Sequence, residues 1–361
     1  MPADKLEACF ERRENNFDFL RMLFACLVIY SHSFSTAEGT YLHEPLSVFS
    51  HEIATFGSLS VGAFFIISGA LITRSMLNGR SVARFCKRRA ARLFPGYLVA
   101  SAVCLLVFAV ATHDGRNSLL LARRMILIDR PISPAVWPHN PYPFNLNGSV
   151  WTIKYELACY VMVGILGVVL MLRWWIVLPF FWIITLIPAA ASRWHILPAF
   201  LLPLMGALPL FAFFLAGMAG YVCRRWIPMS APLFVGCIGA LIALWHFGRP
   251  PDGVALQPVL FSYIVLYVAF SRHLPFGHFG RFGDFSYGTY LYAFPIQQTI
   301  AWRFPDIHPV RIFFLALPAT VAVAVLSWHL IEKPFLHRRS RATAPDADTS
   351  GATVKPLVGA P

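Results

Sequence analysis

Long apolar runs separated by short polar segments make up most of the chain. About ten of them approach the ~20 residues that a helix needs to cross a bilayer. They are 16–34, 53–72, 93–111, 150–172, 174–191, 196–222, 232–247, 255–270, 285–302 and 312–331. The pattern predicts an all-α integral membrane protein with about ten transmembrane helices.

This pattern divides the chain into three regions. Residues 1–16 are a polar N-terminal segment, residues 17–334 form one membrane domain, and residues 335–361 are a polar tail that we expect to be disordered. An even number of helices leaves both termini on the same side. We expect that side to be the cytoplasm, because this choice places most Lys and Arg residues in inner segments.

Composition and charge agree with a membrane protein. Hydrophobic residues make up 57% of the chain and charged residues 13%, against about 25% charged residues in a soluble domain. The net charge of +13 indicates basic cytoplasmic loops beside anionic lipid, so we expect no nucleic-acid partner. The seven cysteines lack Cys-x-x-Cys spacing, which favours small buried residues over disulfides or a metal site. The first apolar run also lacks a convincing cleavage site for a signal peptide.

The first run, NFDFLRMLFACLVIYSHSF, carries Asp18, Arg21 and His32. Ionisable residues are costly inside a membrane and indicate a functional site. Arg21 and His32 lie eleven positions apart, so both leave the helix on nearly the same face, about 16–17 Å apart along its axis. A lone His is more often a structural residue bonded to a backbone carbonyl. Its combination with Asp18 and Arg21 favours a general base instead.

The second run contains SVGAFFIISG, in which Gly62 and Gly69 are seven residues apart and share a helix face. Two interpretations are open. The glycines can form a seam for close helix packing, or they can let the backbone and Ser68 approach a ligand inside the bundle.

The segment 74–92, which we expect to be a cytoplasmic loop, is the most basic part of the chain. If it is helical, Arg88 and Arg89 both neighbour Arg92 on the helix surface. Such an arginine face suits phosphate groups. The alternative is a purely topological role, with contacts to membrane lipid.

The run 150–172 opens with SVWTIKYELACY, in which Thr152 and Tyr160 flank Glu156 on one helix face. Glu156 lies roughly 9 Å from the start of this run. Because the first helix runs outward and this one inward, we expect Glu156 and His32 at similar depths near the outer surface. A carboxylate there would orient the imidazole. A structural pair of Glu156 with a Lys or Arg is the alternative.

Two other stretches are less specific. Residues 112–149 are rich in Pro and aromatic residues, and we expect them to form a long loop. Polar side chains lie around an expected kink at Pro295 and could line a polar cavity: Ser286, Tyr287, Tyr290, Tyr292 and Gln297.

Together these stretches resemble acyltransferase family 3, bacterial membrane O-acyltransferases that modify surface polysaccharides. The resemblance covers nearly the whole chain, from Phe17 to Pro334. Five family motifs match in order: Arg-(ten residues)-His at Arg21 and His32, Phe-Phe-x-x-Ser-Gly at Phe64, Phe65, Ser68 and Gly69, Arg-x-x-Arg at Arg89 and Arg92, Trp-Thr…Glu at Trp151, Thr152 and Glu156, and Ser-Tyr…Tyr-Leu at Ser286, Tyr287, Tyr290 and Leu291.

The resemblance implies transfer of an acyl group, usually acetyl, from cytoplasmic acyl-CoA to a saccharide hydroxyl across the bacterial inner membrane. Acetyl-CoA or another acyl-CoA would be the donor substrate, with no permanently bound cofactor. The acceptor would be O-antigen, capsule, exopolysaccharide or a glucan.

The resemblance also assigns roles to residues. The catalytic set would be His32, Glu156 and Arg21, with His32 removing the acceptor proton or carrying the acyl group. The phosphates of acyl-CoA would bind three arginines: Arg88, Arg89 and Arg92. The pocket would be lined by Phe64, Phe65, Ser68, Gly69, Trp151, Tyr160, Ser286 and Tyr287.

A rival function uses the same polar residues. Intramembrane Arg, His and Glu also suit a transporter or flippase for a lipid-linked saccharide or a small anion. Transporters often show inverted repeats, and none is visible in this sequence. A membrane protease is less consistent with the chain, because no Gly-x-Ser-x-Gly motif accompanies Ser68 and His32.

Overall fold

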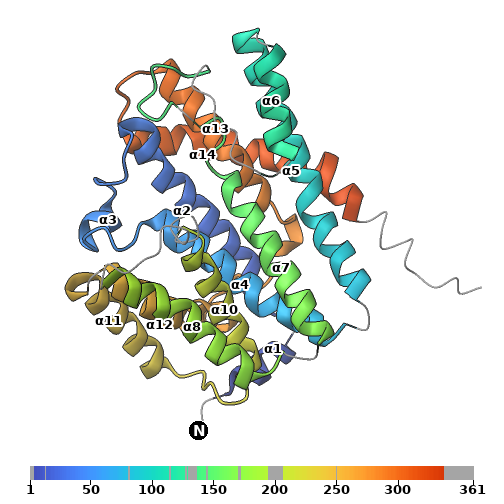
Figure 1. Ribbon diagram of the computed structural model, residues 1–361, viewed down its shortest axis with the longest axis vertical. Helices are drawn as coiled ribbons and strands as arrows, with labels where there is room; N and C mark the ends of the chain where they lie inside the picture. Colours follow the sequence, from blue (N-terminus) through green and yellow to red (C-terminus); the bar gives the residue numbers. More distant parts are fainter. Residues whose placement is uncertain are drawn as a thin grey trace, which may run out of the picture.

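Figure 1 shows the computed structural model, which describes residues 4–12, 14–79, 82–113, 115–126, 128, 136–143, 145–169, 172–193, 206–248 and 250–336. The regular elements of these residues are helices, which confirms the all-α prediction. They are α1 (Leu6–Glu11), α2 (Phe17–Glu38), α3 (Pro45–Phe49), α4 (Phe56–Leu77), α5 (Val82–Thr112), α6 (Gly115–Ile126), η1 (Val150–Thr152), α7 (Ile153–Val168), α8 (Trp174–Arg193), α10 (Leu208–Val222), α11 (Ala231–Phe247), α12 (Pro250–Phe270), η3 (Phe279–Phe282), α13 (Ser286–Arg303), α14 (Pro309–Ser327) and η4 (Trp328–Glu332).

Five helical stretches among the described residues are long and apolar enough to cross a membrane: Phe17–Glu38, Phe56–Leu77, Val82–Val110, Val150–Val168 and Pro309–Leu336. Each of the other apolar runs falls at least partly on a helix. The count of about ten crossings and the cytoplasmic termini remain predictions. The tail expected to be disordered, 335–361, lies outside the described residues from 337 onward.

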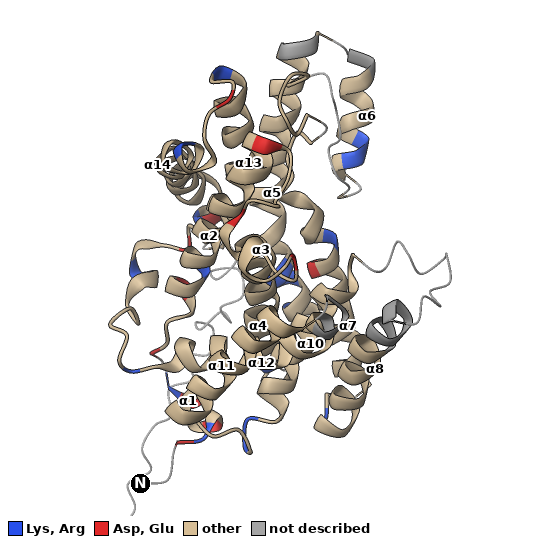
Figure 2. Ribbon diagram, turned by 90° about the vertical axis from the view of Figure 1, so that its left-hand side faces the viewer, with Lys and Arg blue, Asp and Glu red and all other residues tan. Residues whose placement is uncertain are grey.

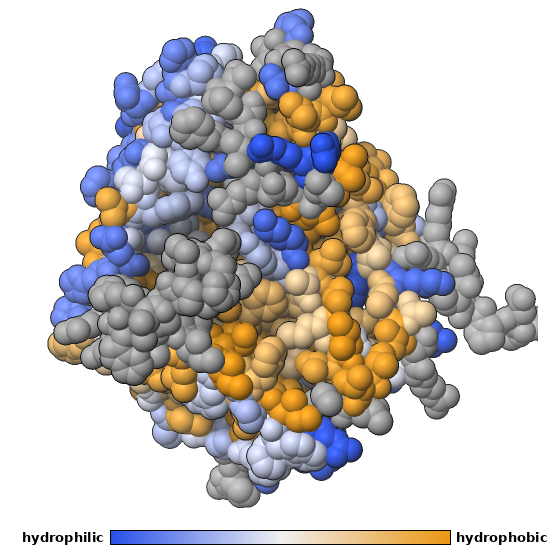
Figure 3. Space-filling view, viewed as in Figure 1, coloured by the Kyte–Doolittle hydropathy of each residue, from blue (hydrophilic) through white to orange (hydrophobic). Residues whose placement is uncertain are grey.

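The surface is that of a protein that faces lipid tails along its sides. Large apolar side chains such as Leu106, Val110 and Phe314 are about two thirds exposed, and Figure 3 shows apolar surface across much of the molecule. Charged residues are sparse along most helices and gather mainly in the connections between them (Figure 2). This distribution is the one that a bilayer requires, because charges are costly in its apolar core.

Two segments that we expected to be loops contain helix. The helix α5 begins at Val82, so the basic stretch before residue 93 forms its first turns. Ala, Arg, Lys and Leu favour a helix whatever their hydropathy, and a count of apolar positions misses this. The expected loop 112–149 contains α6, whose buried Leu121 and Met125 pack against α5.

The segment 145–149, just before η1 and α7, enters the helix bundle without helical structure. The Asn147 side-chain amide donates a hydrogen bond to the Leu291 carbonyl oxygen at 2.9 Å, and the Tyr290 hydroxyl donates one to the Ser149 carbonyl oxygen at 2.6 Å. Irregular backbone is tolerated at such depth only where protein groups satisfy it. As a result, α7 starts opposite Tyr290 on α13, inside the bundle and not at its surface.

The helices α2 and α4 lie at the centre of the bundle, where α2 packs against α4, α13 and α14, and α4 also packs against α10. Contact between α4 and α10 depends on glycine. A Cβ atom at Gly69 would lie 2.1 Å from the Phe214 carbonyl oxygen, and one at Gly217 would lie 2.1 Å from the Ile66 carbonyl oxygen. Gly62 likewise faces Phe213. The packing interpretation of the glycine seam is therefore confirmed.

Candidate active site

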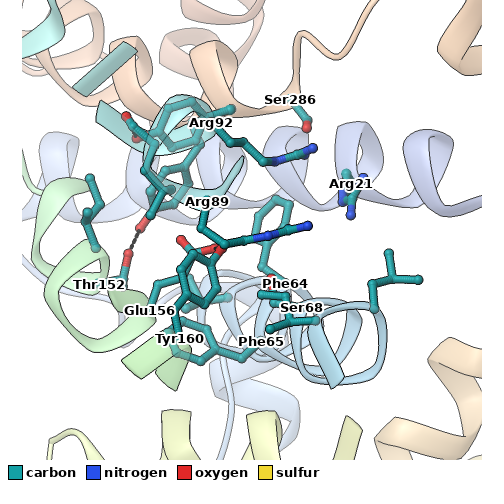
Figure 4. Close-up of a pocket in the computed structure, with 17 residues that line it drawn as sticks. Arg21, Phe64, Phe65, Ser68, Arg89, Arg92, Thr152, Glu156, Tyr160 and Ser286 are labelled. Atoms are coloured by element: carbon teal, nitrogen blue, oxygen red, sulfur yellow. Dashed lines mark hydrogen bonds between the residues drawn. The ribbon is translucent and has the colours of Figure 1, made fainter. Parts of the chain in front are cut away.

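A cavity of about 300 Å³ lies between α2, α4, α5, α7 and α13. Figure 4 shows the side chains of Arg89 and Arg92 extending from α5 toward Arg21 on α2. We call this region the arginine cavity. Its lining comprises Arg21, Val61, Phe64, Phe65, Ser68, Leu71, Ile72, Arg89, Arg92, Leu93, Thr152, Ile153, Glu156, Tyr160, Ser286, Tyr287 and Tyr290.

Asp284 joins two of the arginines. Its carboxylate pairs with Arg92 and lies 3.9 Å from an Arg21 nitrogen, and Ser286 donates a hydrogen bond to it at 2.6 Å. Burial opposes ionisation of Asp284, but the charges of Arg92 and Arg21 outweigh it and lower its pKa to about 2. Arg21 also pairs with Asp18 at 3.1 Å, one helical turn away. Both guanidinium groups are thus held by carboxylates.

Arg89 differs from its two neighbours. Its Nε is buried without a hydrogen-bond partner, and none of the carboxylates in the described part of the chain forms an ion pair with it. Glu156 accepts a hydrogen bond from Tyr160 and lies within electrostatic range of Arg92, Arg89 and Arg21. An arginine whose buried Nε has an unused N–H is suited to bind an anionic or carbonyl oxygen of a ligand.

His32 lies farther along α2, outside the lining of the arginine cavity. Its ring packs edge-on against Phe294 with centroids 5.3 Å apart and lies 6.4 Å from the ring of Tyr41. Its Nδ1 is buried and has no hydrogen-bond partner. Phe294 follows the cavity residue Tyr290 by one turn of α13, so His32 lies about one helical turn beyond the end of the cavity.

The structure corrects the predicted pairing of Glu156 with His32. Glu156 lies among the arginines and is hydrogen-bonded to Tyr160, while Nδ1 of His32 has no partner. The reason is the irregular segment before α7, which starts this helix deep in the bundle. Glu156 therefore reaches the level of Arg21 and not that of His32.

The remaining predicted residues divide between the cavity and its surroundings. Phe64, Phe65, Ser68, Tyr160, Ser286 and Tyr287 line the arginine cavity together with Arg21, Arg89, Arg92 and Glu156. Three do not. Arg88 is exposed on α5, Gly69 faces α10, and Trp151 packs against the Tyr155 ring at 5.7 Å.

Comparison with known proteins decides the family. A family model for an acyltransferase domain matches residues 14–329. The chain belongs to acyltransferase family 3.

Two relatives of this acyltransferase align over most of their length. An O-acetyl transferase of Shigella phage Sf6 is 29% identical over 344 residues, which cover 91% of this chain and 98% of the relative. Nodulation protein 10 of Rhizobium leguminosarum bv. viciae is 27% identical over 381 residues, covering 91% of this chain and 95% of the relative. No solved structure matches the chain.

Sequence reasoning missed Asp284 as the ion-pair partner of Arg92 and Arg21 in this acyltransferase. Asp284 stands two residues before Ser286 in GDFSYG, directly before α13. An acidic residue just outside an apolar run normally indicates a solvent-exposed turn. The available signal was an excess of arginine, because charges buried in a bundle need partners of opposite sign.

Proposed function

We propose that this chain is a membrane O-acyltransferase that moves an acyl group, typically acetyl, from acyl-CoA to a saccharide hydroxyl. The donor enters at the arginine cavity, and the acceptor meets it at His32. In the bacterial inner membrane the start of α2 faces the cytoplasm, so the extracytoplasmic or lipid-linked acceptor lies at the other end. The carrying observation is that Arg21 on α2 lines one cavity with Arg89 and Arg92 of α5, and that α2 also carries His32, whose buried Nδ1 has no hydrogen-bond partner. The O-acetyl transferase relative supports the choice of acetyl.

The charges of the arginine cavity favour Arg89 as the principal contact for acyl-CoA. Arg21 and Arg92 share Asp284, whereas Arg89 has an unused N–H. The cavity of about 300 Å³ is at the small end of ligand sites, which span about 300–1,000 Å³. It suits the thioester arm of acyl-CoA, with the phosphates toward the start of α5.

His32 is placed to handle the proton of the acceptor. In direct transfer, the hydroxyl oxygen attacks the thioester carbonyl, and the imidazole takes the hydroxyl proton. The C–S bond then breaks as the ester C–O bond is completed, and the proton passes to the leaving thiolate. In the second route the imidazole itself carries the acyl group between the two substrates. Either route needs a neutral imidazole.

The function is tested on the surface glycan of a deletion strain that carries wild type or His32→Ala at matched membrane levels. Mass spectrometry detects a base-labile ester on the glycan, and its mass identifies the acyl group. We expect the ester with wild type and none with His32→Ala. If no ester forms but export of the whole glycan falls, transport replaces acyl transfer as the function. An ester that survives in His32→Ala would refute the role of His32.

Donor binding is tested with two neighbouring arginines. Arg89→Ala removes a charge-assisted contact worth about 1.5–3 kcal/mol, so acetyl-CoA should bind at least about tenfold more weakly. Arg88→Ala, at an exposed position, should change the affinity by less than about threefold. Isothermal titration of the purified protein in nanodiscs measures both. Equal losses for the two variants would contradict the assignment of Arg89.

A further inference from the structure

A second cavity lies at the opposite end of α2 from Arg21, where α2, the segment 139–141 and the α13–α14 connection meet. Figure 1 shows the end of α2 next to the α13–α14 connection. Its volume is about 360 Å³. We call it the distal cavity. The surface at the upper left of Figure 3, where the end of α2 and the α13–α14 connection lie, is largely hydrophilic. Its lining comprises Thr36, Ala37, His139, Asn140, Pro141, Ala301, Trp302, Phe304, Pro305, Asp306 and Ile307.

The distal cavity is close to His32 but separate from it. Thr36 follows His32 by one helical turn, about 6 Å along the axis, and its hydroxyl donates a hydrogen bond to the His32 carbonyl oxygen at 2.9 Å. Next to the cavity-lining Pro141, Tyr142 packs against Phe294 with centroids 6.2 Å apart, and Phe294 in turn contacts His32. A molecule bound in the distal cavity therefore lies within one sugar unit of the imidazole without occupying the reaction site.

Aromatic and hydrogen-bonding groups converge in this cavity. Trp302 and Phe304 are 54% and 49% exposed although both are large and apolar. Asn140 is buried, and its amide nitrogen donates to the side chain and the backbone of Gln298 at 2.8 and 2.9 Å. Those two bonds fix the Asn140 amide, so its oxygen has a defined position in the wall. Asp306 adds an exposed carboxylate.

We propose that the distal cavity binds a saccharide ring of the acceptor, next to the unit that is acylated. The apolar C–H face of a sugar ring packs on an aromatic side chain, and its hydroxyls need donors and acceptors around the rim. An aromatic residue that only anchors the helix at the membrane surface requires no polar hollow beside it. This proposal rests on the proposed acyl transfer and specifies how the acceptor is held.

A remote subsite has a defined kinetic signature. Contacts to a non-reacting sugar unit strengthen acceptor binding and leave the chemistry at His32 and the donor site unchanged. Trp302→Ala should therefore raise the KM for the acceptor about tenfold, as the loss of one aromatic contact would, while the KM for acetyl-CoA stays constant. Asp306→Asn should raise the acceptor KM about threefold, in line with one hydrogen bond.

Matched variants separate this role from a loss of folding. Asp306 has a left-handed backbone with φ of 60°, which Asn also adopts readily, so Asp306→Asn removes the charge without straining the chain. Trp226 is an equally exposed tryptophan, at 59%, that follows α10 outside both cavities. Trp226→Ala is the control for general effects of losing an exposed indole.

The experiment uses fragments of the host strain's own surface glycan, freed of esters by mild base and sorted by length. Wild type, Trp302→Ala, Asp306→Asn and Trp226→Ala are assayed in nanodiscs with acetyl-CoA and fragments of one to four units. We expect wild type and Trp226→Ala to prefer longer fragments and Trp302→Ala to lose that preference. If all variants keep the wild-type preference, the distal subsite is refuted while acyl transfer stands. If wild type esterifies no fragment, the proposed function itself fails, and the subsite with it.

Discussion

Asp284→Asn tests the electrostatic design of the arginine cavity. The pKa of about 2 for Asp284, against an ordinary value of 3.8, corresponds to about 2 kcal/mol in favour of the folded state at neutral pH. The Asp284 side chain is 16% exposed and that of its partner Arg92 is 38% exposed, so solvent screens part of this interaction. The loss should therefore stay below the 3–5 kcal/mol typical of a broken, fully buried pair. We expect Asp284→Asn to lower the free energy of unfolding by about 2 kcal/mol at pH 7.

The assay is reversible unfolding in mixed detergent micelles, with Asp18→Asn as the matched control. Asp18 pairs with the same Arg21 but is 43% exposed, so its removal should cost less than about 1 kcal/mol. A double-mutant cycle with Arg92→Gln isolates the interaction between the two residues. The losses of unfolding free energy in the two single variants should add up to more than the loss in the double variant. Equal losses for Asp284→Asn and Asp18→Asn, or simple additivity with Arg92→Gln, would refute the reasoning.

The effect also has a defined pH window. Because folding lowers the pKa of Asp284, its contribution is fully present above the ordinary value of 3.8 and is lost as the pH falls toward about 2. The difference between wild type and Asp284→Asn should therefore be constant from pH 8 to about pH 5. It should shrink only below about pH 4.

Two further predictions concern close contacts. Gly69→Ala places a Cβ against the Phe214 carbonyl oxygen and should lower the thermal unfolding temperature sharply. The control Ser68→Ala, at the cavity wall, should change stability by less than about 1 kcal/mol. Comparable unfolding temperatures for the two variants would contradict the packing role of Gly69. Gly148→Ala places a Cβ 2.6 Å from the Phe294 ring and should reduce kcat by displacing that ring from the imidazole. Phe294→Leu in the same chain should restore part of the activity, and no recovery in a steady-state assay would count against this mechanism.

The sequence predicted well those features that depend on local pattern. Apolar run length located the helices, and helical spacing placed Arg89 and Arg92 on one face and Glu156 beside Tyr160. These residues line one cavity because they sit on long regular helices. The sequence analysis assigned both Ser68 and Gly69 to the pocket lining, and the structure separates them. Adjacent residues on a helix point about 100° apart, so Ser68 faces the arginine cavity and Gly69 faces α10.

The sequence failed where depth depends on tertiary contacts. The depth of Glu156 was counted from the start of its apolar run, on the assumption that the run begins at the membrane surface. The hydrogen bonds of Asn147 and Ser149 to α13 pull that start into the bundle. No periodicity encodes such a shift, because the residues that cause it lie outside the helix and their partners are more than a hundred positions away.

In the proposed function, the helix α2 serves substrates from two sides of a membrane. It carries Arg21 at the arginine cavity, His32 about 16–17 Å farther along and Thr36 about 6 Å beyond that at the distal cavity. All three positions belong to one rigid element, so their separations are fixed by helix geometry and not by loop conformation. We therefore propose that acyl-CoA reaches His32 by extending its flexible arm past Tyr290 and Phe294, since the arginines proposed to hold it cannot move along the helix. In the same proposal, the acceptor hydroxyl lies at His32 while the rest of the saccharide remains outside the apolar core.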